Sequence, residues 1–533
     1  MHSPFRLTYH RLLIFCCAAL LLVLIAGCAA PVAAPAQPAA DAAESAPSGE
    51  PKSGGVLITA RAADAKGLDP HLQTAFASFR AIEHIYEPLL ALDPDMNVVP
   101  NLAATWEWSD DGTTLTVQLQ PGVTFHNGNA LTSADVKFSF ERLLNEETGA
   151  AARSFFTSIQ SIDTPDDLTV IFHLDAPNAA ILAAMTNPNS AILSQAWMDG
   201  GGDPATEAVG TGPFKLTSWE ADNVMKLEAN RDYWREGLPR LDGIEFRTIP
   251  DESSILAGLR AGEIDWALIN DPRVAVTASS GAGALTISRA PALAYHVLQL
   301  NASRPQFEDV RVRQAISCAI DRQQVLDTAS LGEGEVTSPA TPSFYRAPLA
   351  DLTCYQKDLE KSKALLAEAG VSDISFTVIA AGDEPPTAVA EAQNIQAQLA
   401  EIGVTVEIET LELGVYVDRW LAGDFDAAVA LNGGNPDPDN MFFRYWHSTG
   451  NLNKVANYSS PEIDALLEKG RATTDVNERK AIYLDVQKAL AEAAPWVWLY
   501  VGYEYRLMQP DVQGFTPMSN GATTYLRETW LDR

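Results

Sequence analysis

The chain has 533 residues, of which 47% are hydrophobic and 20% charged, and its formal net charge is −32. This length exceeds what one hydrophobic core supports, so we expect two or three lobes. A surface this acidic repels nucleic acid and anionic lipid headgroups, and no basic run offsets it, which disfavours nucleic acid as a partner.

The N-terminus has the pattern of a secretory signal. Arg6 and Arg11 are the only Arg, Lys, Asp or Glu side chains before Cys28, and residues 12–26 form an uncharged apolar run. This pattern predicts a signal peptide over residues 1–27. The sequence Leu-Ile-Ala-Gly-Cys resembles the lipobox of bacterial lipoproteins, which implies that Cys28 becomes the first mature residue and carries the lipid. An uncleaved membrane helix is the alternative, and the apolar run is short for one.

A low-complexity segment follows the expected lipidation site. Ala, Pro and Ser dominate residues 28–52. A segment with so few large apolar side chains cannot form a core, so it predicts a flexible tether. We therefore expect the folded part of the chain to lie at the outer face of the cytoplasmic membrane, held there by the lipid, in a periplasm or at the cell surface.

Two cysteines remain in the folded part, Cys318 and Cys354. An exported chain permits a disulfide between them. Because Cys318 lies in an apolar helical pattern, two buried free thiols are the alternative.

From residue 54 onward, strand and helix patterns are mixed. Thr132 or Ser133 is suited to cap a helix that begins near residue 132, and Gly370 to end another. The last strand is expected to rejoin an earlier sheet. We expect strands at 54–62, within 113–128, and at 168–175, 214–220, 223–230, 244–250, 264–269, 374–381, 404–411 and 496–508. We expect helices at 131–145, 252–263, 310–329, 360–370, 390–403, 460–472 and 477–495.

Motifs of the common catalytic sites are absent from the sequence. There is no P-loop, no Gly-x-Ser-x-Gly elbow, no His-Glu-x-x-His and no Cys-x-x-Cys, so we expect no ATPase activity, no cofactor and no metal site. Asp437 and Asp439 share one loop and resemble an acid/base pair for glycoside cleavage. Neighbouring carboxylates in a Pro-spaced turn are more often simply solvated, so a secreted glycosidase is only the alternative reading and we expect no enzyme.

Several stretches together resemble family 5 of the extracellular solute-binding proteins of bacterial ABC importers. That family includes oligopeptide, dipeptide, nickel and some oligosaccharide binders. The resemblance covers nearly all of residues 54–533. It is carried by "IYEPLLALD" (85–93), by "GLRAGEIDWA" (258–267), by "DPDNMFF" (437–443), and by residues 98–143, 209–234 and 307–322.

The resemblance implies an α/β fold, the two-lobed periplasmic-binding-protein fold of type II with an extra α+β domain inserted in lobe one. Lobe one would comprise residues 53–79, 206–300 and 496–533, the inserted domain 80–205, and lobe two 301–495. It also implies that a monomer captures an extracellular solute between two closing lobes and delivers it to the permease of an ABC importer, which separate ATPases drive. A purely adhesive surface protein, by contrast, would show no closure on a ligand.

The loop before Asp-Pro-Asp-Asn is where the family places ligand contacts in lobe two. Peptide binders place an Asp there, usually after a Trp, and this chain has Gly434 and Leu431 at the aligned positions. Dipeptide binders also use an Arg for the peptide carboxylate, and Gly382 stands about where that Arg would be. The usual charged anchors for a short peptide are therefore missing from these positions.

We nevertheless expect this loop and nearby aromatic residues to line the ligand cleft. Oligopeptide or dipeptide is the ligand that the family implies. An oligosaccharide or another neutral solute is the alternative, because amides and aromatic rings suit sugar hydroxyls and ring faces, and nickel comes third because no His cluster supports it. Trp420 is expected in the core. The expected cleft residues are Asn432, Gly433, Gly434, Asn435, Asp437, Tyr416 and Trp446.

Overall fold

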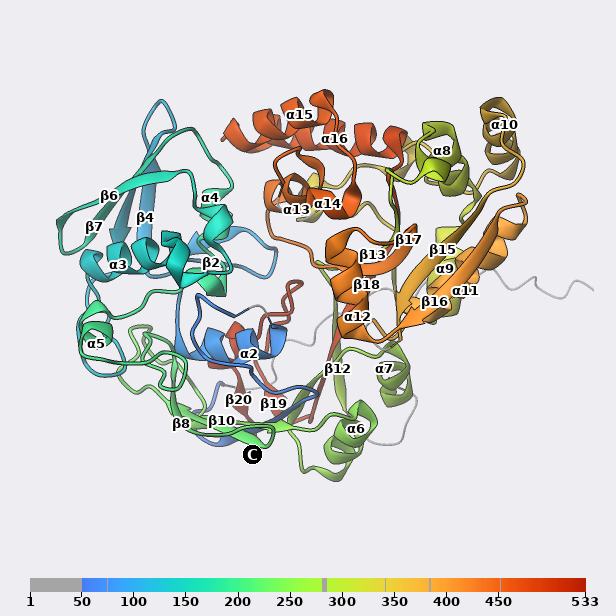
Figure 1. Cartoon of the computed structure of the whole chain (residues 1–533). Helices are drawn as coiled ribbons and strands as arrows, with labels where there is room; N and C mark the ends of the chain where they lie inside the picture. The colour runs from blue at the N-terminus through green and yellow to red at the C-terminus, as the bar shows by residue number, and fades with distance from the viewer. Residues whose placement is uncertain (1–49, 74, 280–284, 341, 383–384, 451) are drawn as a thin grey trace, which may run out of the picture. The chain divides into compact units, whose positions relative to one another are not determined.

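The structure, a computed structural model, describes residues 50–533 except 74, 280–284, 341, 383–384 and 451 (Figure 1). The predicted signal peptide, Cys28 and the tether up to residue 49 lie outside the described residues. Within the described part of the chain, no helix has the length and apolar character that crossing a bilayer requires.

One twelve-stranded sheet contains most of the strands. Ten of them follow the order β16-β15-β17-β13-β18-β11-β1-β10-β9-β8, and β12 and β14 also pair with β18. The bounds are β1 Val56–Arg61, β8 Phe214–Glu220, β9 Val224–Ala229, β10 Gly243–Thr248, β11 Trp266–Ile269, β12 Thr286–Pro291, β13 Tyr295–Leu300, β14 Gly334–Glu335, β15 Ser375–Ala381, β16 Thr405–Leu411, β17 Ala427–Asn432 and β18 Trp496–Met508.

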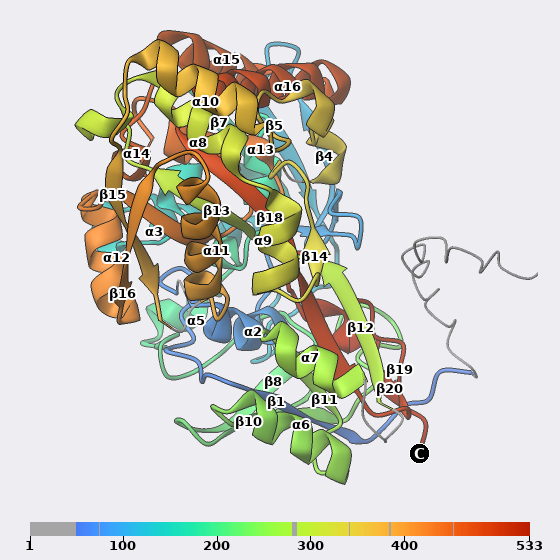
Figure 2. The same cartoon turned by 90° about the vertical axis from the view of Figure 1, so that its right-hand side faces the viewer.

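Strand β18 joins two sections of this sheet, and Figure 2 shows it running from one to the other. Its first residues pair with β13, with Gln299 opposite Trp496 and His296 opposite Tyr500. Its last residues pair with β11 and β12. The last strand thus rejoins an earlier sheet, as predicted. Strand β13, assigned to lobe one from the sequence, pairs along its whole length with β17, and the division into lobes stays a prediction.

A four-stranded antiparallel sheet, in the order β4-β5-β7-β6, lies within residues 80–205. Helix α3 packs on it, where the ring of Phe140 lies 5.2 Å from that of Phe156 and 5.0 Å from that of Phe172. At the start of α3 the Thr132 amide donates to the Asp135 carboxylate at 2.9 Å, in a capping box. The bounds are β4 Ala103–Trp108, β5 Thr114–Leu119, β6 Ile159–Asp166, β7 Thr169–Leu174 and α3 Ser133–Leu144.

The other helices cover the sheets, and two more two-stranded pairs complete the fold. The helices are α2 Phe76–Ile85, α4 Ile181–Ala184, α5 Gln195–Asp199, α6 Glu252–Ala261, α7 Pro272–Ser279, α8 Val310–Ala319, α9 Arg322–Ala329, α10 Leu359–Ala369, α11 Ala388–Ala400, α12 Leu413–Ala422, α13 Pro438–Trp446, α14 Asn453–Ala456, α15 Pro461–Ala472 and α16 Val476–Ala493. The two-stranded pairs are β2 Leu90–Leu92 with β3 Val98–Pro100, and β19 Val512–Gln513 with β20 Trp530–Leu531.

The single helix predicted over 310–329 is wrong. Ile320 is extended, with φ −91° and ψ 118°, so α8 stops before it. The side chain of Asp321 then accepts a hydrogen bond from the amide of Gln324 at 3.1 Å and begins α9. An Asp inside an apolar periodic run was thus a helix N-cap rather than a helix-interior residue.

Cys318 and Cys354 form a disulfide. Cys318 lies in α8 and is fully buried, and Cys354 is 8% exposed. Of the two alternatives that the sequence left open, the structure contains the bridged one.

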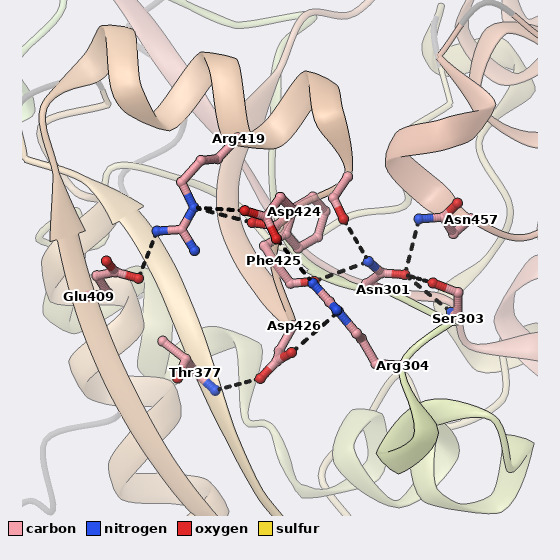
Figure 3. Close-up of polar contacts among 11 residues, drawn as sticks. Asn301, Ser303, Arg304, Thr377, Glu409, Arg419, Asp424, Phe425, Asp426 and Asn457 are labelled. Carbon is pink, nitrogen blue, oxygen red and sulfur yellow. Dashed lines mark hydrogen bonds and ion pairs between the residues drawn. The ribbon is translucent and has the colours of Figure 1, made fainter.

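The turn between α12 and β17 is fixed by a buried asparagine (Figure 3). Asn301, only 1% exposed, donates to the carbonyls of Gly423 and Phe425, both at 3.0 Å. Its own carbonyl accepts from Ser303 and from Asn457, the latter at 3.1 Å. These bonds lock the end of β13 against the start of β17, and this register places the far end of β17 beside Tyr295.

Candidate functional site

A cavity lies where α2, the loop after β17, β18 and the segment 519–522 meet. It is also lined by residues that follow β7 in the sequence, namely Ala183, Ala184, Thr186, Asn187 and Pro188. The side chains that give it its chemical character are Phe76, Phe79, Arg80 and Glu83 of α2, Phe155, and Glu504 of β18. The loop side is formed by Gly433, Gly434, Asn435 and Pro436.

The loop is held at both ends. Strand β17 ends at Asn432, which is paired with Tyr295 of β13. The next residues pass so close to the segment before β13 that a Cβ atom on Gly434 would collide with the backbone of Leu293, while Gly433 has open space around it. The guanidinium of Arg444 donates to the carbonyl of Gly433. Glycine at 434 is therefore required by a close approach of two backbone segments.

Three of the predicted cleft residues, Gly433, Gly434 and Asn435, line this cavity. Asn432 and Asp437 flank them, but these two residues are only 3% and 6% exposed, and their side chains are engaged with protein groups. Asn432 accepts from Gln299 at 3.1 Å and donates to the Tyr295 hydroxyl at 3.2 Å. Asp437 is paired with a buried arginine and caps α13.

The structure places the predicted aromatic residues Tyr416 and Trp446 in the core. The hydroxyl of Tyr416 donates to the Val429 carbonyl at 2.9 Å. Trp446 is 1% exposed, and its ring lies 4.5 Å from that of Trp496. Trp420, expected in the core, packs against the same cluster and donates to Gln299 at 2.6 Å. None of the three lines the cavity.

The two carboxylates considered as an acid/base pair each have an arginine partner. Asp439 is fully buried, and Arg471 donates to it at 2.8 and 3.0 Å. Burial raises the pKa of Asp439 despite that arginine. Arg479 donates to both carboxylate oxygens of Asp437, whereas both donors of Arg471 reach the same oxygen of Asp439. A general acid or base must reach its substrate, but Asp439 is fully enclosed and both oxygens of Asp437 are already bound by an arginine.

The described residues hold no group of three or more His, Cys, Asp or Glu side chains arranged to bind a metal ion. Several histidines instead contact protein groups: His71 and His84 are fully buried, and His126 is half-buried. Burial lowers the pKa of His71 and that of His126 to about 4, and that of His84 to about 3. Nε2 of His71 lies 3.0 Å from the Ala191 carbonyl, and Nε2 of His126 lies 3.0 Å from that of Gly212.

Sequence reasoning missed a cluster of charges that lies in and under the cavity: Arg80, Glu83, Glu504 and Arg506. Glu83 accepts from the amide of Thr523 at 2.8 Å, and burial raises its pKa. Arg506, fully buried, donates to Glu504 at 2.8 Å, and burial lowers its pKa. The only signal in the sequence was a set of charged residues inside two otherwise apolar segments, 76–85 and 496–508, more than 400 residues apart.

Comparison with known proteins identifies relatives over most of the chain. Residues 97–453 match the family described as bacterial extracellular solute-binding proteins, family 5, middle region. Glutathione-binding protein GsiB of Pectobacterium atrosepticum is 29% identical to the chain, covering 81% of this chain and 86% of that protein. The probable di/tripeptide-binding protein 5 of Pseudomonas aeruginosa is 30% identical, covering 78% and 84%.

A solved structure agrees with these matches. The ABC transporter-associated periplasmic binding protein DppA from Helicobacter pylori, in complex with the peptide STSA, has a TM-score of 0.76 and 29% identity, and the alignment covers 90% of this chain and 99% of that chain. This likeness confirms the α/β periplasmic-binding-protein fold predicted from the sequence. The chain belongs to family 5 of the bacterial extracellular solute-binding proteins.

Proposed function

We propose that the protein is the substrate-binding component of an ABC importer and that its solute is a short peptide. The observation that carries the choice of a peptide is the mixture of groups in the cavity. Phe76, Phe79 and Phe155 supply apolar surface, while Arg80 and Glu504 supply both signs of charge. A peptide has an ammonium group, a carboxylate and apolar side chains, so it can use all three. The two relatives are named for binding glutathione and di- or tripeptides, and the solved relative holds the peptide STSA.

The bound peptide would sit between the loop 433–436 on one side and α2 with β18 on the other. The cavity has a volume of about 150 Å³, and pockets that bury a small ligand are typically about 300–1,000 Å³. The two sides must therefore separate before a peptide enters and approach again around it. Strand β18 is shared by both sections of the sheet: its first residues pair with β13 and its last residues with β11. Such a movement would therefore bend β18 at its middle residues, between these two pairings.

Delivery requires the protein to stay close to the permease. We infer that residues 1–27 are removed, that Cys28 carries a lipid, and that residues 29–52 tether a monomeric domain to the outer face of the membrane. The division into lobe one, an inserted domain at 80–205 and lobe two belongs to the same proposal. The protein would do no chemistry on its solute, which accords with the arginine pairing of Asp437 and Asp439.

Thermal unfolding in the presence of candidate solutes tests the proposal. The protein would be residues 50–533, which form one compact unit. The panel would contain di- to hexapeptides and α- and β-linked oligosaccharides of the same size. A solute that binds only the native state raises the Tm. At a concentration of 100 Kd it stabilises that state by about 2.7 kcal/mol. Stabilisation by peptides supports the proposal, and stabilisation by sugars alone would refute it in favour of a neutral solute that is read by Asn435 and the backbone amides of the loop.

A further inference from the structure

Arg80 lines the cavity, and its guanidinium has more N–H donors than the described residues supply with hydrogen-bond acceptors. The side chain is 13% exposed, and its closest acidic oxygen is that of Glu83, at 3.9 Å. Its Nε is buried and has no hydrogen-bond partner among the described residues. The guanidinium carbon lies 5.9 Å from the ring centroid of Phe76, which lines the same cavity. A guanidinium offers five N–H donors, and leaving donors unpaired in a buried site is costly.

The acidic groups nearest to Arg80 are engaged elsewhere. Glu83 accepts from both the amide and the hydroxyl of Thr523. Glu504 is paired with the buried Arg506 at 2.8 Å. Among the described residues Arg80 is therefore left with one long ion pair, to Glu83 at 3.9 Å, and with an unpaired Nε, although it lines the cavity.

Gly521 makes room for this arrangement. It has a φ of +70°, and a Cβ atom there would collide with the guanidinium of Arg80 and with the carboxylate of Glu504. The ends of both side chains thus converge on the same point beside the cavity wall. A ligand that reaches this point meets the guanidinium of Arg80 and the carboxylate of Glu504 together, and such a pair of opposite charges suits a zwitterion.

We propose that Arg80 anchors a carboxylate of the bound peptide through paired N–H donors. This inference rests on the proposed function and names the group that the cavity recognises. The carboxylate comes either from the C-terminus of the peptide or from an Asp or Glu side chain. Both present two oxygens to the planar fork of an arginine, a geometry that lysine cannot reproduce.

Calorimetric titration of the purified full-length protein tests the proposal. Alanine peptides of two to six residues identify the preferred length. At that length, three forms are compared: the free acid, the C-terminal amide, and the amide with one Glu in place of Ala. Wild type should bind the free acid at least about 30-fold more tightly than the plain amide. Recovery of affinity in the Glu-containing amide would identify a side-chain carboxylate as an equally good source.

Variants of Arg80 assign the effect to this residue. Arg80→Gln should bind the free acid and the amide with similar affinity, and Arg80→Lys should keep part of the difference. If Arg80→Gln fails to fold, Arg80→Lys provides the test by itself. Lysine retains the charge and loses only the planar fork, so the difference in affinity between acid and amide should shrink but not vanish. The matched control is Arg527→Gln. Like Arg80, Arg527 is mostly buried (11% exposed), lies over an aromatic ring (Tyr525), and has only a long ion pair, from Nε to Glu528 at 3.5 Å, but it does not line the cavity.

Two results would overturn the inference while the proposed function stands: wild type binds acid and amide equally, or Arg80→Gln weakens both forms to the same extent, as a purely structural residue would. If no alanine peptide binds the wild-type protein, the proposed function fails and this inference fails with it.

Discussion

The guanidinium of Arg479, on α16, donates to both carboxylate oxygens of Asp437, at 2.5 and 2.7 Å. The two side chains are 6% and 8% exposed. Asp437 also accepts from the amide of Asp439 at 2.8 Å and so caps α13. One carboxylate thereby connects the end of the cavity loop to a helix 42 residues further along the chain.

Removing the arginine should destabilise the protein strongly. In Arg479→Met the carboxylate of Asp437 stays buried without its partner, and the free energy of unfolding should fall by about 3–5 kcal/mol. Urea denaturation of the variant and the wild type measures this difference. Lys469→Ala is the control, because the pair of Lys469 with Glu478 is exposed and 3.9 Å apart, and such pairs contribute little. Equal midpoints for Arg479→Met and wild type would contradict the expected cost.

Two adjacent glycines of the cavity loop should respond differently to the same substitution. A Cβ atom at Gly434 would collide with the Leu293 backbone, whereas at Gly433 it would meet nothing within 4 Å. Gly434→Ala should therefore displace the loop, lower the free energy of unfolding by about 1–3 kcal/mol and weaken peptide binding. Gly433→Ala should leave stability nearly unchanged. Chemical denaturation and calorimetric titration of both variants check this, and equal behaviour of the two variants would refute the close approach.

Local signals in the sequence were enough to predict most of the elements. Ser460 and Pro461 predict the start of α15, and Gly370 predicts the end of α10, and the structure has both. The Ser460 hydroxyl accepts from the amide of Ile463 at 3.2 Å, which is a contact between near neighbours. Such signals act over one turn of helix, so they are readable without knowledge of the fold.

The chemistry of the cavity could not be predicted in this way. Arg80 and Glu504 meet at Gly521, three positions whose proximity depends on the complete sheet order. Asp437 was expected to face a ligand because the sequence gives no sign of its partner Arg479, which lies in another helix. Tyr416 and Trp446, both on helices, were expected in the cleft for the same reason: their neighbours Val429 and Trp496 come from two strands of the sheet. Residue type and spacing identify candidates, but burial decides which of them face the solute.

The disulfide should make the protein sensitive to reduction. The bridge between Cys318 and Cys354 closes a loop with a sequence separation of 36. Constraining an unfolded chain by a loop of this size contributes about 3–4 kcal/mol in the chain-entropy model. Denaturation with and without a thiol reductant should show a loss of this order for the wild type. The double variant Cys318→Ser, Cys354→Ser serves as the control and should show no response to the reductant.

Buried histidines should make the protein less stable at mildly acidic pH. Burial lowers the pKa of His84 from 6.5 to about 3, and those of His71 and His126 from 6.5 to about 4. Below pH 6.5 the unfolded chain therefore binds protons that the folded chain does not. The stabilising contribution is fully present above 6.5 and is lost as the pH falls toward the lowered values, by up to about 1.4 kcal/mol per pH unit for each histidine.

Urea denaturation at several values between pH 7 and pH 5 measures this dependence above the range in which most carboxylates titrate. In the variant His84→Gln an amide can still reach the Thr523 hydroxyl, which lies 3.1 Å from Nε2 of His84. The slope of its unfolding free energy against pH should be smaller than that of the wild type by the contribution of one histidine. His173→Gln is the control, because the His173 side chain is 39% exposed on the four-stranded sheet. The slope is the readout, since it is independent of any constant loss of packing in the variant. An unchanged slope in His84→Gln would show that the folded protein already accommodates a charged imidazole at that position.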